Sequence, residues 1–274
     1  KAGMNPREFA AILAEELANS EGISGADIAG PGFLNVRVAA GAQGEIARLV
    51  LAAGDSYGHH ASRDTKVNLA FISANPTGPL HLGHTRWAAV GDALGRVLRA
   101  GGYEVNNEFY INDRGNQMDL FGASLMARAN GEAPPENGYQ GDYVSDIAAQ
   151  IVAEHPAITS LPEDEQLVAF REAGYKFQLG EHQSQLANFR TEFDVWFSER
   201  SLHESDAVEV SLAMLDGQGR SYVDEGAIWM RTTDFDDDKD RVLVKSDGSL
   251  TYFASDTAYY VNKRGRGFDK CIYL

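Results

Sequence analysis

The sequence predicts an α/β fold in which helices cover both faces of a parallel sheet. An apolar run at residues 66–72, closed by turn-forming residues, has the composition of a buried strand. A helical pattern follows from about Leu82 and ends at Gly101-Gly102, and a second strand pattern fills residues 103–111. A strand, a helix and a strand in this order form a right-handed unit with parallel strands. We therefore expect a Rossmann-like, doubly wound sheet.

Length and composition are typical of a folded protein of the cytoplasm. With 274 residues, 43% of them hydrophobic, the chain can form a sizeable core. It contains no run of eighteen apolar residues, no signal-peptide segment and only one cysteine, Cys271. We therefore expect a soluble, cytoplasmic protein with no membrane contact. The net charge of −16 argues against a surface that coats nucleic acid, so any such contact would be local.

Residues 1–55 are expected to form a small unit of their own. Asn5 can cap its first helix, and Pro6 suits the first turn of that helix. The expected elements are a helix over residues 5–19, a strand at 33–38 and a helix at about 43–53. The polar, glycine-containing stretch 54–64 has the composition of a linker. The second domain is then residues 56–274.

The second domain continues the sheet and carries an insertion at about residues 131–192. This stretch is rich in turns and contains two helical patterns, at about 143–154 and 166–192. The elements expected after it are a strand at 193–199, a helix at 205–216, strands with a hairpin at 222–245, a helix from about 257 to 262 and a strand from 269. Residues 236–238, three aspartates, form either an exposed acidic turn or a metal site.

The candidate site lies between the first strand of the sheet and its helix. Residues 75–79, Asn-Pro-Thr-Gly-Pro, cannot continue a strand, because the two prolines lack a backbone donor. A helix therefore starts near the carboxyl end of a parallel strand, where its N–H groups and dipole favour a phosphate. His81 and His84 stand at this start with Gly83 between them. The alternatives are a zinc-binding pair and two surface histidines without a role.

This stretch carries a resemblance to a known family. Residues 73–84 read Ser-Ala-Asn-Pro-Thr-Gly-Pro-Leu-His-Leu-Gly-His, which resembles the His-x-Gly-His element of class I aminoacyl-tRNA synthetases and the lead-in of arginyl-tRNA synthetases in particular. The resemblance covers nearly all of the chain. It implies that His81 and His84 are catalytic, donating hydrogen bonds to phosphate oxygens of ATP. Gly83 would then let the nucleotide lie against the backbone.

The same resemblance implies an arginine pocket. Tyr252 and Asp256 match the Tyr-x-x-x-Asp element by which the family grips arginine, here across an expected strand-to-helix corner. The other implied arginine-binding residues are Asn75, Gln117 and Glu199. Gln117 ends a loop that matches the family, although that loop could equally be a helix start capped by its aspartate. For Asp256 the alternative is likewise a helix cap.

A contact with tRNA is implied for the first unit. The family segment that matches residues 31–35 meets the tRNA, which would make Phe33 a base-stacking platform and Asn35 a hydrogen-bonding reader. The alternative is that Phe33 belongs to the core and Asn35 to a turn. One position departs from the family, because Ala70 stands where an acidic residue is expected five positions before Asn75.

The function implied by the resemblance is that of an arginine–tRNA ligase. Such an enzyme activates arginine with ATP to arginyl-adenylate and transfers it to tRNA(Arg). Mg²⁺ accompanies ATP, no metal-binding residues are expected in the chain, and we expect a monomer. Nothing resembles the Lys-Met-Ser-Lys-Ser loop or the anticodon-binding domain, so we expect an incomplete fragment that is inactive by itself. The alternatives are another nucleotidyl-transfer ligase with a His-x-Gly-His helix and a non-catalytic tRNA-binding derivative.

Overall fold

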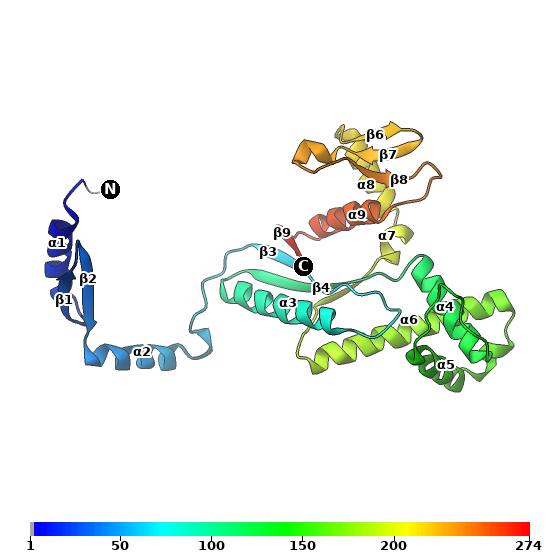
Figure 1. Cartoon of the computed structure of the whole chain (residues 1–274), viewed down its shortest axis with the longest axis horizontal. Helices are drawn as coiled ribbons and strands as arrows, with labels where there is room; N and C mark the ends of the chain where they lie inside the picture. Colours follow the sequence, from blue (N-terminus) through cyan, green and yellow to red (C-terminus); the bar gives the residue numbers. More distant parts are fainter. Residues whose placement is uncertain (1–2) are drawn as a thin grey trace. The chain divides into compact units, whose positions relative to one another are not determined.

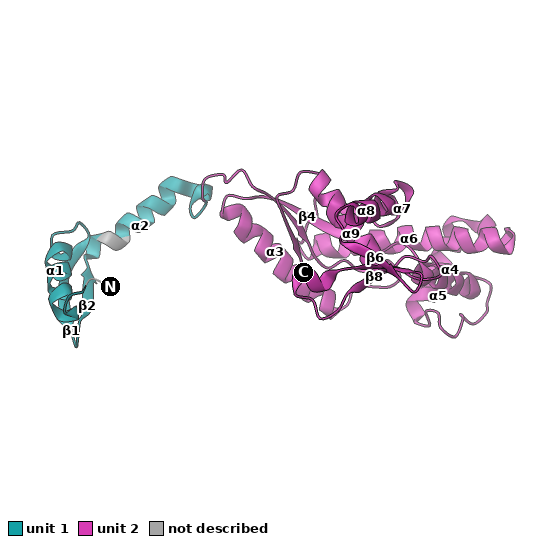
Figure 2. Cartoon of the chain, turned by 90° about the horizontal axis from the view of Figure 1, so that it is seen from above, with its two compact units in different colours: residues 1–59 teal, residues 60–274 magenta. Residues whose placement is uncertain are grey.

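The computed structural model describes residues 3–274, without the side chains of residues 42 and 43. The chain divides into two compact units, residues 1–59 and 60–274, which Figure 2 shows in different colours. Within the described residues, no helix is both long and apolar enough to cross a membrane.

In the first unit a helix packs on a two-stranded antiparallel sheet. Its elements are α1 (Pro6–Ala18), β1 (Ile23–Ala29), β2 (Phe33–Val38), α2 (Ala40–Ala53) and a 3₁₀ turn (Gly54–Ser56). The predicted cap of α1 is confirmed, since the Asn5 side chain accepts a hydrogen bond from the N–H of Arg7 at 2.9 Å. The turn between the strands is tied to the start of α1, because Arg7 Nη1 donates to the carbonyl of Gly30 at 3.1 Å. No strong signal marks β1, which is rich in small and polar residues.

The second unit is built on a parallel sheet with the strand order β5-β4-β3-β9. Its strands are β3 (Lys66–Ala70), β4 (Glu104–Ile111), β5 (Val195–Ser198) and β9 (Lys270–Tyr273). This confirms the predicted parallel sheet. The chain runs outward from β3 to β4 and β5 and later returns on the other side of β3 as β9, so the order reverses between β3 and β9. Ligands of such sheets bind outside the carboxyl ends of the strands at the reversal.

Helices cover both faces of this sheet, with α3 and α6 on one side and α9 on the other (Figure 1). The helices are α3 (Leu82–Ala100), α4 (Asn116–Ala129), α5 (Asp142–Glu154), α6 (Glu163–Asn188), α7 (Arg200–Glu204), α8 (Ala207–Gly217) and α9 (Tyr252–Gly265), with 3₁₀ turns at Pro156–Ser160 and Thr232–Phe235. A small antiparallel sheet lies between α8 and α9 in the sequence and consists of β6 (Ser221–Asp224), β7 (Ala227–Met230) and β8 (Arg241–Val244). Helices on both faces confirm a doubly wound arrangement.

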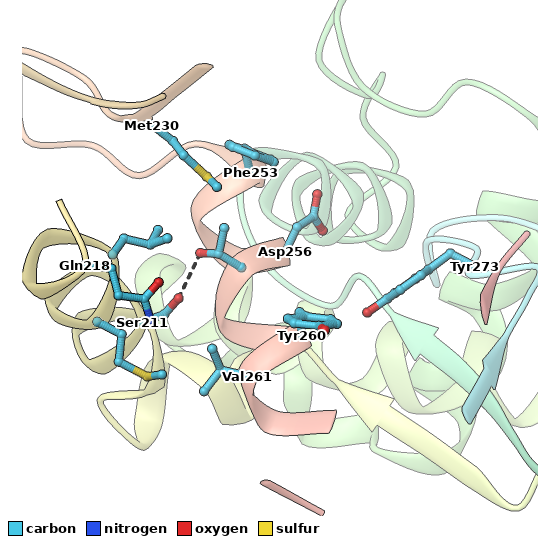
Figure 3. A pocket seen from close by; sticks show the side chains of 11 residues that line it. Ser211, Gln218, Met230, Phe253, Asp256, Tyr260, Val261 and Tyr273 are labelled. Carbon is cyan, nitrogen blue, oxygen red and sulfur yellow. Dashed lines mark hydrogen bonds between the residues drawn. The ribbon is translucent and has the colours of Figure 1, made fainter. Parts of the chain in front are cut away.

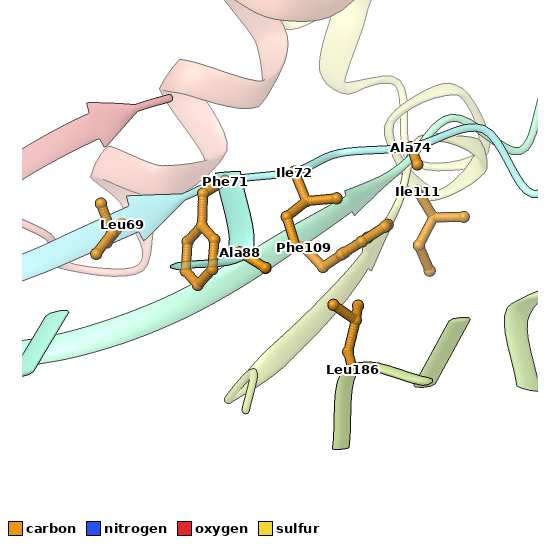
Figure 4. Close-up of a cluster of buried hydrophobic side chains, with 8 residues drawn as sticks. All are labelled: Leu69, Phe71, Ile72, Ala74, Ala88, Phe109, Ile111 and Leu186. Carbon is orange, nitrogen blue, oxygen red and sulfur yellow. The ribbon is translucent and has the colours of Figure 1, made fainter. Parts of the chain in front are cut away.

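The core on the α3 side of the sheet joins strand and helix residues (Figure 4). Its buried members are Leu69, Phe71, Ile72, Ala74, Ala88, Phe109, Ile111 and Leu186. Helix α3 enters this core through small residues, since Ala88, Gly91 and Gly95 are buried whereas Trp87 is exposed. A Cβ on Gly91 would lie 2.2 Å from Cδ2 of Phe71, which is far inside van der Waals contact. The helix therefore lies closer to the sheet than any larger side chain would permit.

A second core lies among α4, α5 and α6, which we call the three-helix unit. Its buried residues are Phe121, Leu125, Val144, Ile147, Ala148, Ile151, Ile158 and Phe170. Here too glycines allow close packing, because a Cβ on Gly174 would lie 2.3 Å from Cδ1 of Leu125 and one on Gly122 would lie 2.8 Å from Cβ of Arg171. Helix α6 runs on from this core to the sheet, where Leu186 packs in the first core. Helix α6 thus joins the three-helix unit to the sheet through both cores.

The start of α9 differs from the expectation. The helix begins at Tyr252 rather than at about residue 257, so Tyr252 and Asp256 lie one turn apart on a single helix. The predicted strand-to-helix corner is wrong, and so is the alternative that Asp256 caps the helix. Thr251 occupies the N-cap position, and its side chain makes no capping hydrogen bond there. Thr251 is a common N-cap residue, but the run Leu250-Thr251-Tyr252-Phe253 has the β-branched and aromatic composition of a strand, which concealed the start of the helix.

The close approach of α3 predicts a specific loss of stability. Gly91→Ala should lower the free energy of unfolding by about 1–3 kcal/mol, because the added methyl group meets the ring of Phe71, which has no room to move. Gly180→Ala is the matched control, since a Cβ there meets no atom within 4 Å in a helix and should stabilise by about 0.5–1 kcal/mol. Urea unfolding followed by tryptophan fluorescence measures both, because all three tryptophans lie in the second unit. Equal stability of the two variants would contradict the packing described here.

Candidate active site

The site is built on the β3–α3 loop, residues 71–81, at the carboxyl end of β3. The loop leaves the strand through two residues in the left-handed region, Ile72 with φ 71° and Ser73 with φ 51°. A β-branched residue there is strained, and such strain persists only where the surroundings impose it. The side chain of Ile72 is anchored in the first core. Burial of Ile72 therefore holds the backbone in the turn that leads toward α3.

His81 and His84 cap the start of α3 reciprocally. Nδ1 of His81 accepts a hydrogen bond from the N–H of Gly83, and Nδ1 of His84 accepts one from the N–H of His81, each at 3.1 Å. The two rings stack with their centroids 3.7 Å apart. A Cβ on Gly83 would lie 2.9 Å from Cε1 of His81, so glycine leaves room for the capping ring. Because each Nδ1 accepts, each neutral ring carries its proton on Nε2.

Burial, followed by the charges of His81 and His182, lowers the pKa of His84. His84 is therefore neutral near pH 7, which preserves both the cap and an Nε2–H donor. A cavity of about 310 Å³ adjoins the two rings. Its lining residues are Ser73, Ala74, Asn75, Thr77, Gly78, Pro79, His81 and His84. Hydrogen-bond donors at a helix start beside a cavity suit an anionic ligand such as a phosphate.

The structure brings Asn75 and Gln117 together. Nδ2 of Asn75 donates a hydrogen bond to Oε1 of Gln117, which lies in the first turn of α4. The cap position of α4 is Gly115, so the alternative role of Asp113 as that cap is wrong. Asp113 instead accepts hydrogen bonds from Ser198 Oγ at 2.5 Å and from the N–H of Arg200 at 3.2 Å. It ties the end of β4 to the end of β5.

Glu199 lies directly after β5 and is only 5% exposed. Burial raises its pKa, and the nearby charges of Asp113 and Asp256 act in the same direction, against Ser255 and Arg114. Glu199 lines a cavity of about 440 Å³. The other lining residues are Arg114, Gly115, Lys245, Leu250, Thr251, Tyr252 and Ser255. A buried carboxylate with other acids close by favours a cationic ligand, whose charge would relieve the repulsion.

Tyr252 and Asp256 line different cavities. Tyr252 is 71% exposed and shares the cavity of Glu199. Asp256 lines a larger cavity of about 680 Å³ together with Tyr260 and Tyr273, shown in Figure 3. The Asp256 side chain reaches the surface, yet the surrounding protein raises its pKa. The structure thus places the two residues on one helix but does not bring them into one pocket.

Ala70 occupies the position at which an acidic residue was expected, and it pairs in the sheet with Glu108 of β4. No sequence pattern had identified Glu108. Glu108 is fully buried and accepts hydrogen bonds from Arg266 Nη1 at 2.6 Å and Nη2 at 2.9 Å, as well as from Asn68 and Tyr259. Burial alone would raise the pKa of Glu108, but the hydrogen bonds of Arg266 and Tyr259 lower it overall. Glu108 is already paired, so it does not replace the missing acid toward a ligand.

Two residues of the three-helix unit form contacts with the β3–α3 loop that no sequence pattern indicated. The hydroxyl of Tyr143 donates to the carbonyl of Thr77 at 2.9 Å. Nε2 of His182 lies 2.8 Å from the carbonyl oxygen of Gly78. These partners lie 66 and 104 residues apart in the chain, so local patterns could not reveal them.

In the first unit, Phe33 and Asn35 both lie on β2. Phe33 is 71% exposed, and Asn35 is an exposed strand residue paired with Asp27. The alternative of a core phenylalanine and a turn asparagine is therefore wrong for the described chain. An exposed ring on a strand is available for stacking.

Metal binding finds no support among residues 3–274. They contain no group of three or more His, Cys, Asp or Glu side chains that could hold a metal ion. In the acidic turn, Asp237 and Asp238 both accept hydrogen bonds from Arg241 at 2.7–2.8 Å. Within the described part of the chain, neither the histidine pair nor the aspartates have the further ligands that a zinc or other metal site needs.

Comparison with known proteins gives a consistent result. The family model described as tRNA synthetases class I (R), catalytic domain, matches residues 46–151, and that of the arginyl tRNA synthetase N-terminal domain matches residues 1–38. The chain is 53% identical to the arginine–tRNA ligase of Kineococcus radiotolerans and 50% identical to that of Paenarthrobacter aurescens. Each match covers 100% of this chain and 50% of the relative. The chain spans about half the length of the curated relatives it matches.

Solved structures agree with this result. A crystal structure from Campylobacter jejuni assigned to the arginyl-tRNA synthetases superimposes with a TM-score of 0.77 at 33% sequence identity. The match covers 84% of this chain and 51% of that one. Sequence relatives, family models and fold therefore lead to the same conclusion: the chain belongs to the arginyl-tRNA synthetase family.

Proposed function

We propose that this chain is part of an arginine–tRNA ligase. Residues 1–55 would be the end of a tRNA-contacting domain, and residues 56–274 the ATP- and arginine-binding domain with an insertion at about 131–192. The observation that carries the proposal is the start of α3, where the two imidazoles that cap the helix present Nε2–H donors beside a cavity at the reversal of the sheet. The relatives named as arginine–tRNA ligases support the choice of substrate.

The first step would join arginine to ATP. An oxygen of the arginine carboxylate attacks the α-phosphorus, and the bond from that phosphorus to the bridging oxygen of pyrophosphate breaks. No side-chain nucleophile takes part, so the protein contributes positioning and charge stabilisation. His81 and His84 would donate through Nε2–H to phosphate oxygens, while Gly83 keeps the backbone accessible. In the second step a hydroxyl of the terminal tRNA adenosine attacks the arginyl carbonyl, and AMP leaves.

Arginine would bind at the carboxyl ends of β3, β4 and β5. Asn75, held by Gln117, is suited to the α-amino or carboxylate end. Glu199 is the best-placed partner for the guanidinium, because it is buried and close to further acids. Tyr252 borders the same cavity, and Asp256 would contribute its charge from the neighbouring one.

Partners beyond arginine and ATP follow from the same proposal. Phe33 and Asn35 would meet tRNA(Arg) on the exposed side of β2. Mg²⁺ would arrive with ATP; since the described residues offer no metal cluster, no step is assigned to a protein-bound metal. We further propose a cytoplasmic monomer.

The phosphate role predicts the effect of removing one donor. His81→Asn keeps an oxygen that can cap α3 but removes Nε2–H, so the fold should persist. In a full-length protein with this sequence, the rate of arginyl-adenylate formation should fall about 10²–10³-fold. Arginine-dependent pyrophosphate exchange measures it, with His155→Asn, an exposed histidine outside the 310 Å³ cavity, as the matched control. Exchange at the wild-type rate in His81→Asn would remove this role.

The guanidinium role predicts a charge-specific loss of affinity. Glu199→Gln should weaken arginine binding by about 2–5 kcal/mol, because a buried guanidinium loses its ionised partner. Citrulline, which is neutral and of similar shape, should lose much less. Asp256→Asn should cost less than Glu199→Gln, since its exposed carboxylate is screened by water. Calorimetric titration of both ligands in the full-length protein measures these differences.

Glu204→Gln is the control, because Glu204 is an exposed carboxylate five residues away. The raised pKa of Glu199 adds a pH dependence. Only the ionised form pairs with arginine, so affinity should decline as the pH falls toward that raised pKa, at higher pH than for an ordinary glutamate. Titrations between about pH 5 and 8 would reveal this decline. Equal losses for arginine and citrulline in Glu199→Gln would assign Glu199 a purely structural role.

A further inference from the structure

The β3–α3 loop is held at three nearby positions by three different helices. Asn75 bonds to Gln117 of α4, the carbonyl of Thr77 accepts from Tyr143 at the start of α5, and the carbonyl of Gly78 faces Nε2 of His182 in α6. All three helices belong to the three-helix unit, and all three contacts precede His81 by at most six residues. The loop is thus held through one side chain and two backbone carbonyls by helices outside the sheet.

His182 is a specific partner rather than a passive core residue. Its side chain is 0% exposed, and its Nδ1 has no hydrogen-bond partner among the described residues. Burial lowers the pKa of His182, so the ring is neutral. Because the carbonyl of Gly78 can only accept, Nε2 carries the proton and donates to it at 2.8 Å. Loss of this donor would leave the half-buried carbonyl of Gly78 without its side-chain partner.

Tyr143 fits the loop closely. A Cβ on Gly78 would lie 3.2 Å from the Tyr143 hydroxyl oxygen, so a glycine at this position gives the hydroxyl access to the neighbouring carbonyl. Since α4, α5 and α6 share the second core and α6 also packs in the core of the sheet, the three contacts come from one packed body. A displacement of that body would shift residues 75–78 together.

We propose that the three-helix unit is a clamp that sets the position of the β3–α3 loop and thereby of His81 and His84. Tyr143 and His182 are positioning residues: they touch the loop backbone rather than the ligand. The nucleotide part of this inference rests on the proposed function. Because coupling between two sites acts in both directions, a ligand bound at the loop would also slow local opening at the start of α5.

Hydrogen–deuterium exchange of the 274-residue chain tests the clamp without any ligand. Tyr143→Phe should speed exchange in a peptide covering residues 73–84 about 3- to 10-fold, because one hydrogen bond that limits local opening is lost. A peptide covering β4 should be unchanged. Tyr139→Phe is the matched control, since Tyr139 packs in the same second core and its hydroxyl makes no hydrogen bond within the described part of the chain.

A second pair of variants separates the hydrogen bond from packing. His182→Leu removes the donor to Gly78 and should also speed exchange at residues 73–84, whereas His182→Gln retains an N–H donor and should restore slow exchange. If His182→Leu does not fold, the exchange rate of residues 73–84 in Tyr143→Phe is the measurement that tests the clamp. Unchanged loop exchange in Tyr143→Phe, or an equal increase in Tyr139→Phe, would overturn the clamp.

Calorimetry with ATP then connects the clamp to the proposed function. If the wild-type chain binds ATP, Tyr143→Phe should weaken binding about 3- to 10-fold and Tyr139→Phe should not. Equal ATP affinity in the wild type and Tyr143→Phe would overturn the positioning role. Failure of the wild-type chain to bind ATP would count against the proposed nucleotide site, and the exchange experiment would still decide the clamp.

Discussion

The reciprocal capping of α3 is the interaction on which the site depends. The first N–H groups of a helix need acceptors, and here two imidazole nitrogens of the chain itself supply them. This use of Nδ1 fixes the tautomer of both rings and leaves their Nε2–H groups for a ligand. Burial and the neighbouring imidazoles keep His84 neutral, so the arrangement holds near pH 7. Local helix chemistry therefore prepares an anion site before any ligand arrives.

The two buried glutamates of the sheet illustrate how surroundings decide function. Glu108 lies within β4 and is paired with Arg266, so its charge stabilises the connection between the sheet and α9. Glu199 lies just past the end of β5, where burial raises its pKa and the charges of Asp113 and Asp256 act in the same direction. The first carboxylate is neutralised by the protein, whereas the second still favours a cation. The same residue type is thus structural in the strand and suited to a ligand at the strand end.

The sequence predicts the elements whose signals are local. Glycines and prolines marked the β3–α3 loop, and Asn5 and the Gly101-Gly102 pair marked helix ends that the structure confirms. The start of α9 was missed because the strand-like residues 250–253 outweighed the N-cap signal of Thr251. The contacts of Tyr143 and His182 join residues far apart in the chain, and the pairing of Glu108 with Arg266 spans 158 positions. Periodicity carries no information about such pairs, so the support of the site needed the structure.

The central claim is that His81 and His84 cap α3 through Nδ1 and present Nε2–H to the ligand. Long-range proton–nitrogen NMR spectra of the chain distinguish the two tautomers of each ring directly. We predict the Nε2–H tautomer for both residues near pH 7, with His84 becoming protonated only below the ordinary histidine pKa of about 6.5. An Nδ1–H tautomer in either ring, or protonation of His84 above that value, would contradict the account.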